Sequence, residues 1–262
     1  MSEIDDVKYD VAVANRVLTA LGLATGPTIS LGHVSKRLPS DPSKFVVKGR
    51  GYKIDALPRM MPEDMVLCDL EGYKLDGPEG VTQCYEVKIH SCIYKLRPDV
   101  QSVVHVHPQF TVLMSILGSG IFPMCQGQGI EILKQEVPTL RKYKIIQSEE
   151  EGMQVAETLG KNKAILLLGH GVVTVGRAPD DVVISTLGLE EQAKMNWYAY
   201  CAAGPNYPKI PDDLVQENFY GGIPYDDLPH FRGAGAETHR AAGNAIFLHY
   251  ADQVSQDLPR RS

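Results

Sequence analysis

The stretch Val103-Val104-His105-Val106-His107-Pro108 decides how the rest of the chain is interpreted. Its β-branched residues predict a buried strand, and the proline predicts where that strand ends. Side chains two residues apart in a strand share one face, so His105 and His107 are expected about 6 to 7 Å apart at their backbones. Because neutral imidazole is a common ligand of divalent ions, the pair predicts a metal site at the end of the sheet. The alternative is two histidines that fell together by chance in a buried strand.

Helical and extended patterns alternate on both sides of this stretch. Apolar residues at helical spacing alternate with short β-branched runs, which predicts a layered α/β fold. Residues 28–42 are expected to form a loop. The predicted helices are 7–23, 84–96, 109–117, 149–159, 180–203 and about 237–254, and the predicted strands are 45–48, 65–70, 103–107, 164–168 and 172–175.

The composition changes near residue 204. Residues 204–235 are rich in proline and glycine, which predicts an irregular arm before the last helix. We therefore expect a catalytic domain over residues 1–204. The arm and helix of residues 205–262 either belong to that domain or pack on a neighbouring subunit.

Composition and charge exclude several classes of protein. Apolar residues make up 44% and charged residues 22% of the 262 residues, which is ordinary for a globular protein. The net charge of −6 argues against a general nucleic-acid binder. No apolar run approaches the ~20 residues that span a bilayer, and the first residues are acidic where a signal peptide would be basic. Five cysteines without a Cys-x-x-Cys pair favour a reduced compartment, so we expect a cytoplasmic protein with no membrane partner.

Two further residues have the chemistry of a metal site. His170 lies between Gly169 and Gly171 at the junction of two apolar strands, where a packing role has little room. It is a candidate ligand, and a histidine that caps a turn is the alternative. Glu86 precedes His90 by four residues on a predicted helix, so both are expected on one face. The Glu86 carboxylate could complete the ligand set or act as a general base, although glutamate on a charged helix is more often solvated.

The motifs together resemble the class II aldolase/adducin family over about residues 10–203. They are Glu86-x-x-x-His90, Arg97-Pro98-Asp99-Val100, His105-Val106-His107-Pro108, Leu168-Gly169-His170-Gly171-Val172-Val173 and Gly32-His33-Val34-Ser35. The resemblance implies a three-layer α/β/α fold around a mixed, largely antiparallel sheet, usually in a cyclic homotetramer. It also implies a divalent metal, often zinc, held by His105, His107 and His170, with Glu86 as catalytic acid/base and candidate fourth ligand. Adducin-type members lose these residues. This chain keeps all four, so we expect an enzyme.

Several residues differ from those of the sugar-phosphate aldolases of this family, and these differences restrict the class of substrate that we expect. Those enzymes carry Gly-Asn-x-Ser in the first loop and a serine pair before the glutamate, and both hold phosphate. Here His33 replaces the asparagine, Cys84-Tyr85 replaces the serines, and residues 118–129 lack the tyrosine that those aldolases take from a neighbouring subunit. A histidine in the first loop is similar to the decarboxylase branch, which acts on hydroxylated aromatic or heteroaromatic carboxylates.

We accordingly assign Gly32, His33 and Ser35 as candidate substrate-binding residues. A loop histidine that merely caps Ser35 is the alternative for His33. Lys88, Arg37 and Arg97 could each hold a carboxylate, although a solvated surface position is the more common role for such residues.

Three functions remain open. The first is a carbon–carbon lyase acting on a small oxygenated carboxylate or carbonyl compound, with decarboxylation ahead of aldol cleavage. The second is an iron(II)-dependent oxygenase on the same fold, and the third is a non-catalytic adducin-like binding protein. Zinc is the favoured metal, while manganese, cobalt and iron(II) suit the same ligands.

Overall fold

Within the part of the chain that the structure describes, nine strands form one sheet whose order departs from their order in the sequence. The computed structural model describes residues 2–51, 54–223, 227–231 and 236–258. The sheet runs β4-β3-β2-β1-β6-β9-β8-β7, and β5 pairs with β2 beside this path. The pairs are antiparallel except β7 with β8, so the expected mixed, largely antiparallel sheet is confirmed. The strands are β1 His33–Arg37, β2 Lys44–Arg50, β3 Met65–Asp69, β4 Lys74–Asp76, β5 Thr82–Gln83, β6 Ser102–Val106, β7 Thr139–Leu140, β8 Ala164–Leu167 and β9 Gly171–Gly176.

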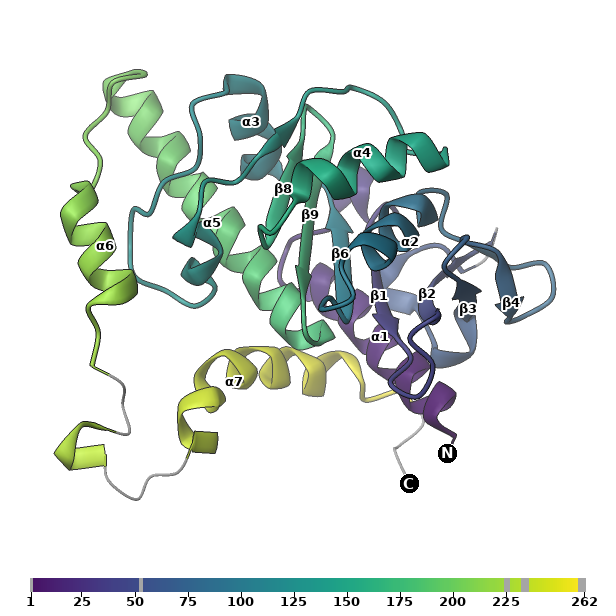
Figure 1. Cartoon of the computed structure of the whole chain (residues 1–262). Coiled ribbons are helices and arrows are strands. Elements are labelled where there is room, and N and C mark those ends of the chain that lie inside the picture. The colour runs from purple at the N-terminus through teal and green to yellow at the C-terminus, as the bar shows by residue number, and fades with distance from the viewer. Residues whose placement is uncertain (1, 52–53, 224–226, 232–235, 259–262) are drawn as a thin grey trace.

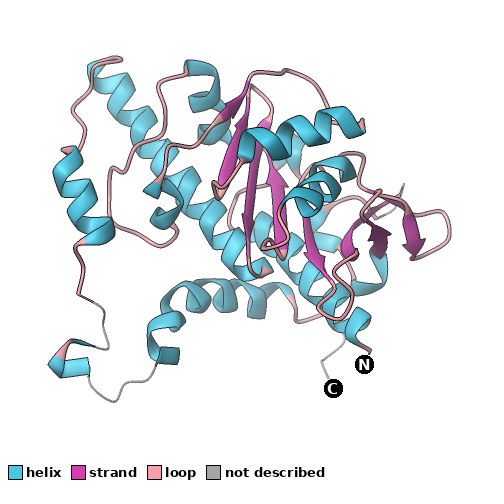
Figure 2. Ribbon diagram, in the orientation of Figure 1, coloured by secondary structure: helices cyan, strands magenta, loops and turns pink. Residues whose placement is uncertain are grey.

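Helices cover both faces of this sheet, which gives the three-layer α/β/α architecture (Figures 1 and 2). One buried cluster joins α1 and α5 to one face, and a second joins α2 and α4 to the other. The helices are α1 Glu3–Ala20, α2 Val87–Leu96, α3 Gln109–Leu117, α4 Glu149–Leu159, α5 Pro179–Ala203, α6 Asp212–Tyr220 and α7 Ala236–Val254. The predicted helices 109–117 and 149–159 coincide with α3 and α4.

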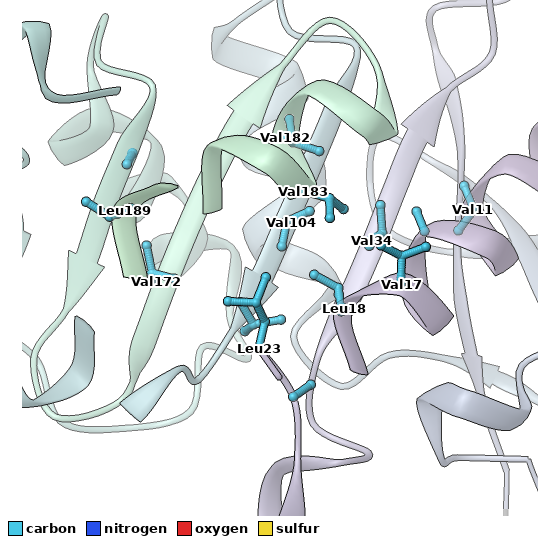
Figure 3. Close-up of a cluster of buried hydrophobic side chains, with 14 of the residues drawn as sticks. Val11, Val17, Leu18, Leu23, Val34, Val104, Val172, Val182, Val183 and Leu189 are labelled. Carbon is cyan, nitrogen blue, oxygen red and sulfur yellow. The ribbon is translucent and has the colours of Figure 1, made fainter. Parts of the chain in front are cut away.

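The central strand β6 packs against both helical layers because its side chains alternate between the two faces of the sheet. Val104 packs in the α1–α5 cluster, which Figure 3 shows together with Val11, Val34 and Val183. Val103 packs in the α2–α4 cluster, so His105 lies on this second face as well. Each fully buried valine contributes about 1.5 to 3 kcal/mol of apolar burial. The same alternation that builds the core therefore directs His105 toward α2.

Several sequence expectations were wrong in detail. The helix expected over residues 7–23 spans Glu3–Ala20, and the short strands β4, β5 and β7 were not expected. Residues 33–37 form β1 rather than part of a loop, because His33, Ser35 and Arg37 are polar but buried beneath α2. The helix expected from residue 84 begins at Val87, so Glu86 occupies the cap position before it. The arm expected to be irregular contains α6, whose Phe219 packs into the α1–α5 cluster.

The C-terminal helix α7 lies against α1 of the same chain (Figure 1). Arg16 of α1 donates a hydrogen bond to the backbone oxygen of Val254 at 2.7 Å, which fixes the end of α7. Residues 224–226, 232–235 and 259–262 of the predicted arm lie outside the described residues. The domain boundary at residue 204 remains a prediction. Among the helices of the described ranges, none combines the length and apolar character needed to cross a bilayer.

Candidate metal centre

The two histidines of the His-x-His motif meet at the end of β6. His105 is fully buried, and its Nδ1 lies 3.0 Å from the backbone oxygen of Val172 on β9. A carbonyl oxygen only accepts, so Nδ1 carries a proton, and Nε2 is the nitrogen that faces the other residues of the group. His107 follows directly after the strand, and its Nε2 lies 2.9 Å from Nε2 of His105. The motif therefore places two imidazole nitrogens at one point.

His170 reaches the same point from the turn between β8 and β9. Gly169 has a φ of +62°, a conformation that side chains rarely adopt, and it turns the chain back sharply. Its N–H donates to Ser115 Oγ of α3 at 3.0 Å, which ties the turn to the neighbouring helix. The His170 ring centroid lies 5.0 Å from that of His105 and 4.9 Å from that of His107.

Glu86 completes the group from the start of α2. Its Oε2 lies 3.3 Å from His105 Nε2 and 3.5 Å from His170 Nε2. Its other oxygen accepts a hydrogen bond from the backbone N–H of Ile146 at 2.9 Å, a contact that the sequence did not predict. Burial by itself would raise the pKa of Glu86, but the facing imidazoles of His105 and His170 outweigh it and hold the pKa well below its usual range. The carboxyl group is therefore ionised at neutral pH.

The donor set of these four residues fits a divalent metal ion. One ligand atom from each of Glu86, His105, His107 and His170 lies within 4.8 Å of the others. Burial, with repulsion from His105 and His170, lowers the pKa of His107 to about 3, so its imidazole is neutral and able to coordinate at neutral pH. Three imidazoles and a carboxylate suit zinc, manganese, cobalt and iron(II).

The glycine after His170 leaves the space that the ligands need. A Cβ atom at Gly171 would lie 2.5 Å from Cδ2 of His107 and 2.5 Å from the backbone oxygen of Val106. We expect Gly171→Ala to lower metal affinity at least tenfold although no ligand is removed, because His107 or β6 must shift. Metal titration of the two proteins measures this change. Gly127→Ala is the matched control, because a Cβ there meets nothing within 4 Å. Unchanged affinity in Gly171→Ala would contradict the geometry.

A cleft of about 560 Å³ opens over three of these four residues, Glu86, His107 and His170. Aliphatic and aromatic side chains form its walls, and two cations, Arg50 and Lys144, lie among them. The wall residues are Leu31, Tyr85, Tyr143 and Ile145. A second cleft of about 770 Å³ also reaches His107 and His170, on the side of α3 and α5, but Glu86 does not line it.

Arg50 is held in the wall of the first cleft by two contacts. Its guanidinium carbon lies 4.0 Å from the ring centroid of Tyr85, and Nη2 lies 3.2 Å from Asp55 Oδ2. Asp55 is shared with the buried Lys48, whose Nζ lies 2.8 Å away. Arg50 therefore keeps donors for a further anion at a fixed place in the cleft.

The chain matches a known protein family over a range that includes all four residues of the metal centre. The family model of the Class II Aldolase and Adducin N-terminal domain matches residues 9–197. The chain belongs to this family. Class II aldolases depend on a divalent metal ion, in agreement with the group of histidines and glutamate described above.

Relatives within the class II aldolase/adducin family have different activities. The chain is 27% identical over 215 residues to 3,4-dihydroxyphthalate decarboxylase of Arthrobacter keyseri, covering 79% of this chain and 84% of that protein. It is 27% identical over 223 residues to L-ribulose-5-phosphate 4-epimerase UlaF of Salmonella paratyphi C, covering 81% and 93%. The structure of L-fuculose 1-phosphate aldolase from Glaciozyma antarctica matches with a TM-score of 0.73 and 25% identity, covering 97% of this chain and 90% of that one. The enzymes of this family thus include decarboxylases, epimerases and aldolases.

The three residues expected to bind substrate lie at different depths. His33 lines the cleft, opposite His105 in the pairing of β1 with β6. Gly32 lies behind it, where a Cβ would come within 2.8 Å of Val106 Cγ1. Ser35 is fully buried, and its Oγ is hydrogen-bonded to His90 and Tyr94. The roles of Gly32 and Ser35 in binding remain predictions.

The cations singled out in the sequence do not line the cleft, whereas Arg50 and Lys144 do. Lys88 pairs with Glu149, Arg97 pairs with Asp99, and the buried Arg37 donates to backbone oxygens. The sequence signal for Arg50 was its position at the end of β2, but strand ends are too common for that to single it out.

A second buried group, His33, Cys84 and His90, lies beside the metal centre. His33 and His90 are hydrogen-bonded to each other, with 2.6 Å between Nδ1 and Nε2. Burial raises the pKa of the Cys84 thiol well above its usual range, so it stays protonated and is a poor ligand. Hydrogen bonding accounts for the two histidines of this group without a second metal.

Proposed function

We propose that this chain is a divalent-metal-dependent carbon–carbon lyase that decarboxylates a hydroxylated aromatic carboxylate. The observation that carries the proposal is the cleft above Glu86, His107 and His170, whose walls are apolar and aromatic and include two cations. A flat ring with vicinal oxygens matches such walls, and its negative charge matches Arg50 and Lys144. A sugar phosphate carries a hydroxyl on most of its carbons, so it offers less apolar surface to Leu31 and Ile145 than an aromatic ring does.

Glu86, His105, His107 and His170 would hold the metal, which would supply a Lewis acid for substrate oxygens. Glu86 is ionised and faces the same space, so it can take the proton of a ring hydroxyl. When the bond between the ring and the carboxylate breaks, carbon dioxide leaves, and the electron pair of that bond stays on the ring carbon. Glu86 then returns the proton to that carbon. The hydrogen bond from Ile146 keeps one carboxylate oxygen fixed during both transfers.

The relatives support this class of reaction. A decarboxylase of 3,4-dihydroxyphthalate and an epimerase of L-ribulose 5-phosphate share similar identity with the chain. The sugar-phosphate aldolases that the sequence resembles carry asparagine in the first loop. This chain has His33 there, which favours decarboxylation over epimerisation.

The direct test is a substrate screen on the purified protein after loading with zinc, manganese, cobalt or iron(II). Carbon dioxide release from dihydroxybenzoates or dihydroxyphthalates is the expected result. Cleavage of sugar phosphates without decarboxylation would replace the proposal with an aldolase. Oxygen uptake with iron would replace it with an oxygenase, and absence of both metal binding and turnover would leave a binding protein.

Arg50 offers a prediction on substrate affinity. We expect Arg50→Gln to raise KM for an aromatic carboxylate about 10- to 100-fold with a smaller effect on kcat, because a charged hydrogen bond contributes about 1.5 to 3 kcal/mol. Steady-state kinetics measures both constants. Arg59→Gln is the control, since Arg59 is exposed and does not line the cleft. An equal KM in the two variants would show that Arg50 does not bind the substrate.

The proposal also specifies the metal, the assembly and the location. Zinc is the favoured ion, a homotetramer is the expected assembly, and the cytoplasm is the expected location. Elemental analysis, sedimentation and cell fractionation test these three statements in turn.

A further inference from the structure

A continuous line of buried hydrogen bonds runs from the core to the cleft. Tyr94 OH lies 2.7 Å from Ser35 Oγ, and Ser35 Oγ lies 2.6 Å from His90 Nδ1. His90 Nε2 then lies 2.6 Å from His33 Nδ1. The first three residues are at most 1% exposed and His33 is 4% exposed, so each of these polar groups needs a partner within the protein.

The direction of the protons along this line follows from its inner end. Tyr94 OH has two neighbours, Ser35 Oγ at 2.7 Å and the backbone oxygen of Gln101 at 3.5 Å. The Gln101 oxygen already accepts from the Arg37 backbone N–H at 2.9 Å. The guanidinium carbon of Arg37 also lies 4.4 Å from the Tyr94 ring centroid, and a cation over the ring makes the phenol a stronger donor. Tyr94 therefore donates to Ser35.

The remaining protons are fixed in sequence, because each group has limited donors. Ser35 has one hydroxyl proton, which it gives to Nδ1 of His90. His90 then carries its proton on Nε2 and donates it to Nδ1 of His33. With Nδ1 accepting, the neutral His33 ring carries its own proton on Nε2, the nitrogen left for the cleft that His33 lines. In the opposite direction Tyr94 Oη would accept from Ser35, and the phenol proton would have only the 3.5 Å contact with Gln101, which is longer than an ordinary O–H···O hydrogen bond.

We propose that Tyr94, Ser35 and His90 are positioning residues that hold His33 as a hydrogen-bond donor through Nε2, directed to an anionic oxygen of the substrate. His33 in this state is neither a general base nor a metal ligand. The choice of a carboxylate or phenolate oxygen as acceptor rests on the proposed function. The relay, by which we mean the line of hydrogen bonds from Tyr94 through Ser35 and His90 to His33, depends only on contacts within the chain. It selects for substrates that place an oxyanion beside His33 and against those that place a donor there, because two donors facing each other leave both unpaired.

The proton position can be measured without turnover. Solid-state ¹⁵N spectra of zinc-loaded protein labelled at the imidazole nitrogens should show a protonated Nε2 and an unprotonated Nδ1 for His33, identified by the signals lost in His33→Gln. Tyr94→Phe removes the first donor but keeps the ring, and should populate the other tautomer of His33. Tyr73→Phe, at an exposed tyrosine, is the matched control and should leave the spectrum unchanged. An unprotonated Nε2 in the unaltered protein would overturn the inference.

Two substitutions of His33 then test the donor itself. Glutamine places an N–H near the position of imidazole Nε2, whereas asparagine reaches only to that of Nδ1. Calorimetry with 3,4-dihydroxybenzoate should show affinity within about threefold of the unaltered protein for His33→Gln and at least tenfold weaker for His33→Asn, with equal metal content. Equal affinities, or metal loss in both variants, would overturn the donor role. If the unaltered protein binds neither dihydroxybenzoates nor dihydroxyphthalates, the proposed function fails, and the spectra still decide where the proton of His33 lies.

Discussion

Replacement of Glu86 by glutamine is expected to leave the metal bound and to lower kcat by about 10²- to 10⁴-fold, the range of general acid–base catalysis. The amide keeps the size of the side chain, and its oxygen can still accept from the N–H of Ile146. Three histidines remain as ligands. What is lost is a group that can take and return a proton.

Metal content and kcat are measured on the same preparation of Glu86→Gln. Glu150→Gln is the control for the exchange of carboxylate for amide, because Glu150 is exposed on α4 and contacts Gln154 one helical turn later. Full activity in Glu86→Gln would remove Glu86 from the mechanism. Loss of metal together with activity would show that Glu86 acts chiefly as a ligand.

Replacement of His107 by alanine is expected to weaken metal binding by 10²-fold or more and to abolish turnover. Changes to residues that merely support a ligand already lower metal affinity about 10- to 100-fold, and loss of a ligand has a larger effect. The remaining Glu86, His105 and His170 form a less complete set. Elemental analysis after dialysis should therefore find about one equivalent of metal in the unaltered protein and little in the variant.

His249→Ala is the matched control, since His249 is exposed on α7, far from the metal centre in the sequence, and belongs to no candidate metal group of the described residues. Its metal content should equal that of the unaltered protein. Metal retained by His107→Ala at full affinity would show that the His-x-His motif does not ligate. Unfolding by urea of both variants without metal separates loss of a ligand from loss of the fold.

Local sequence patterns were sufficient to predict helices whose apolar residues recur at helical spacing and whose ends are marked by flanking residues. Helices α3 and α4 were predicted with correct bounds because Pro108 and Ser148 precede them and Gly118 and Gly160 follow them. Strand β1 was missed because its sequence is mostly polar. The buried polar groups of His33, Ser35 and Arg37 are satisfied by hydrogen bonds to residues of α2. No local sequence pattern encodes such distant partners.

The sequence predicted which residues could bind a metal, but not how the fold brings them together. His105 and His107 had to point the same way because strand geometry is local, and His170 was marked by its two glycines. The meeting of Glu86 with these histidines depends on which strands pair: β1 lies beside β6 and β6 beside β9, although 65 or more residues separate the paired positions. The pairing of β1 with β6 puts His33 opposite His105, and Arg50, at the end of the neighbouring strand β2, lies in the cleft wall. Contacts between distant segments are set by packing of the whole core, so the metal ligands could be named from the sequence, whereas the donor relay and the cations of the cleft required the folded chain.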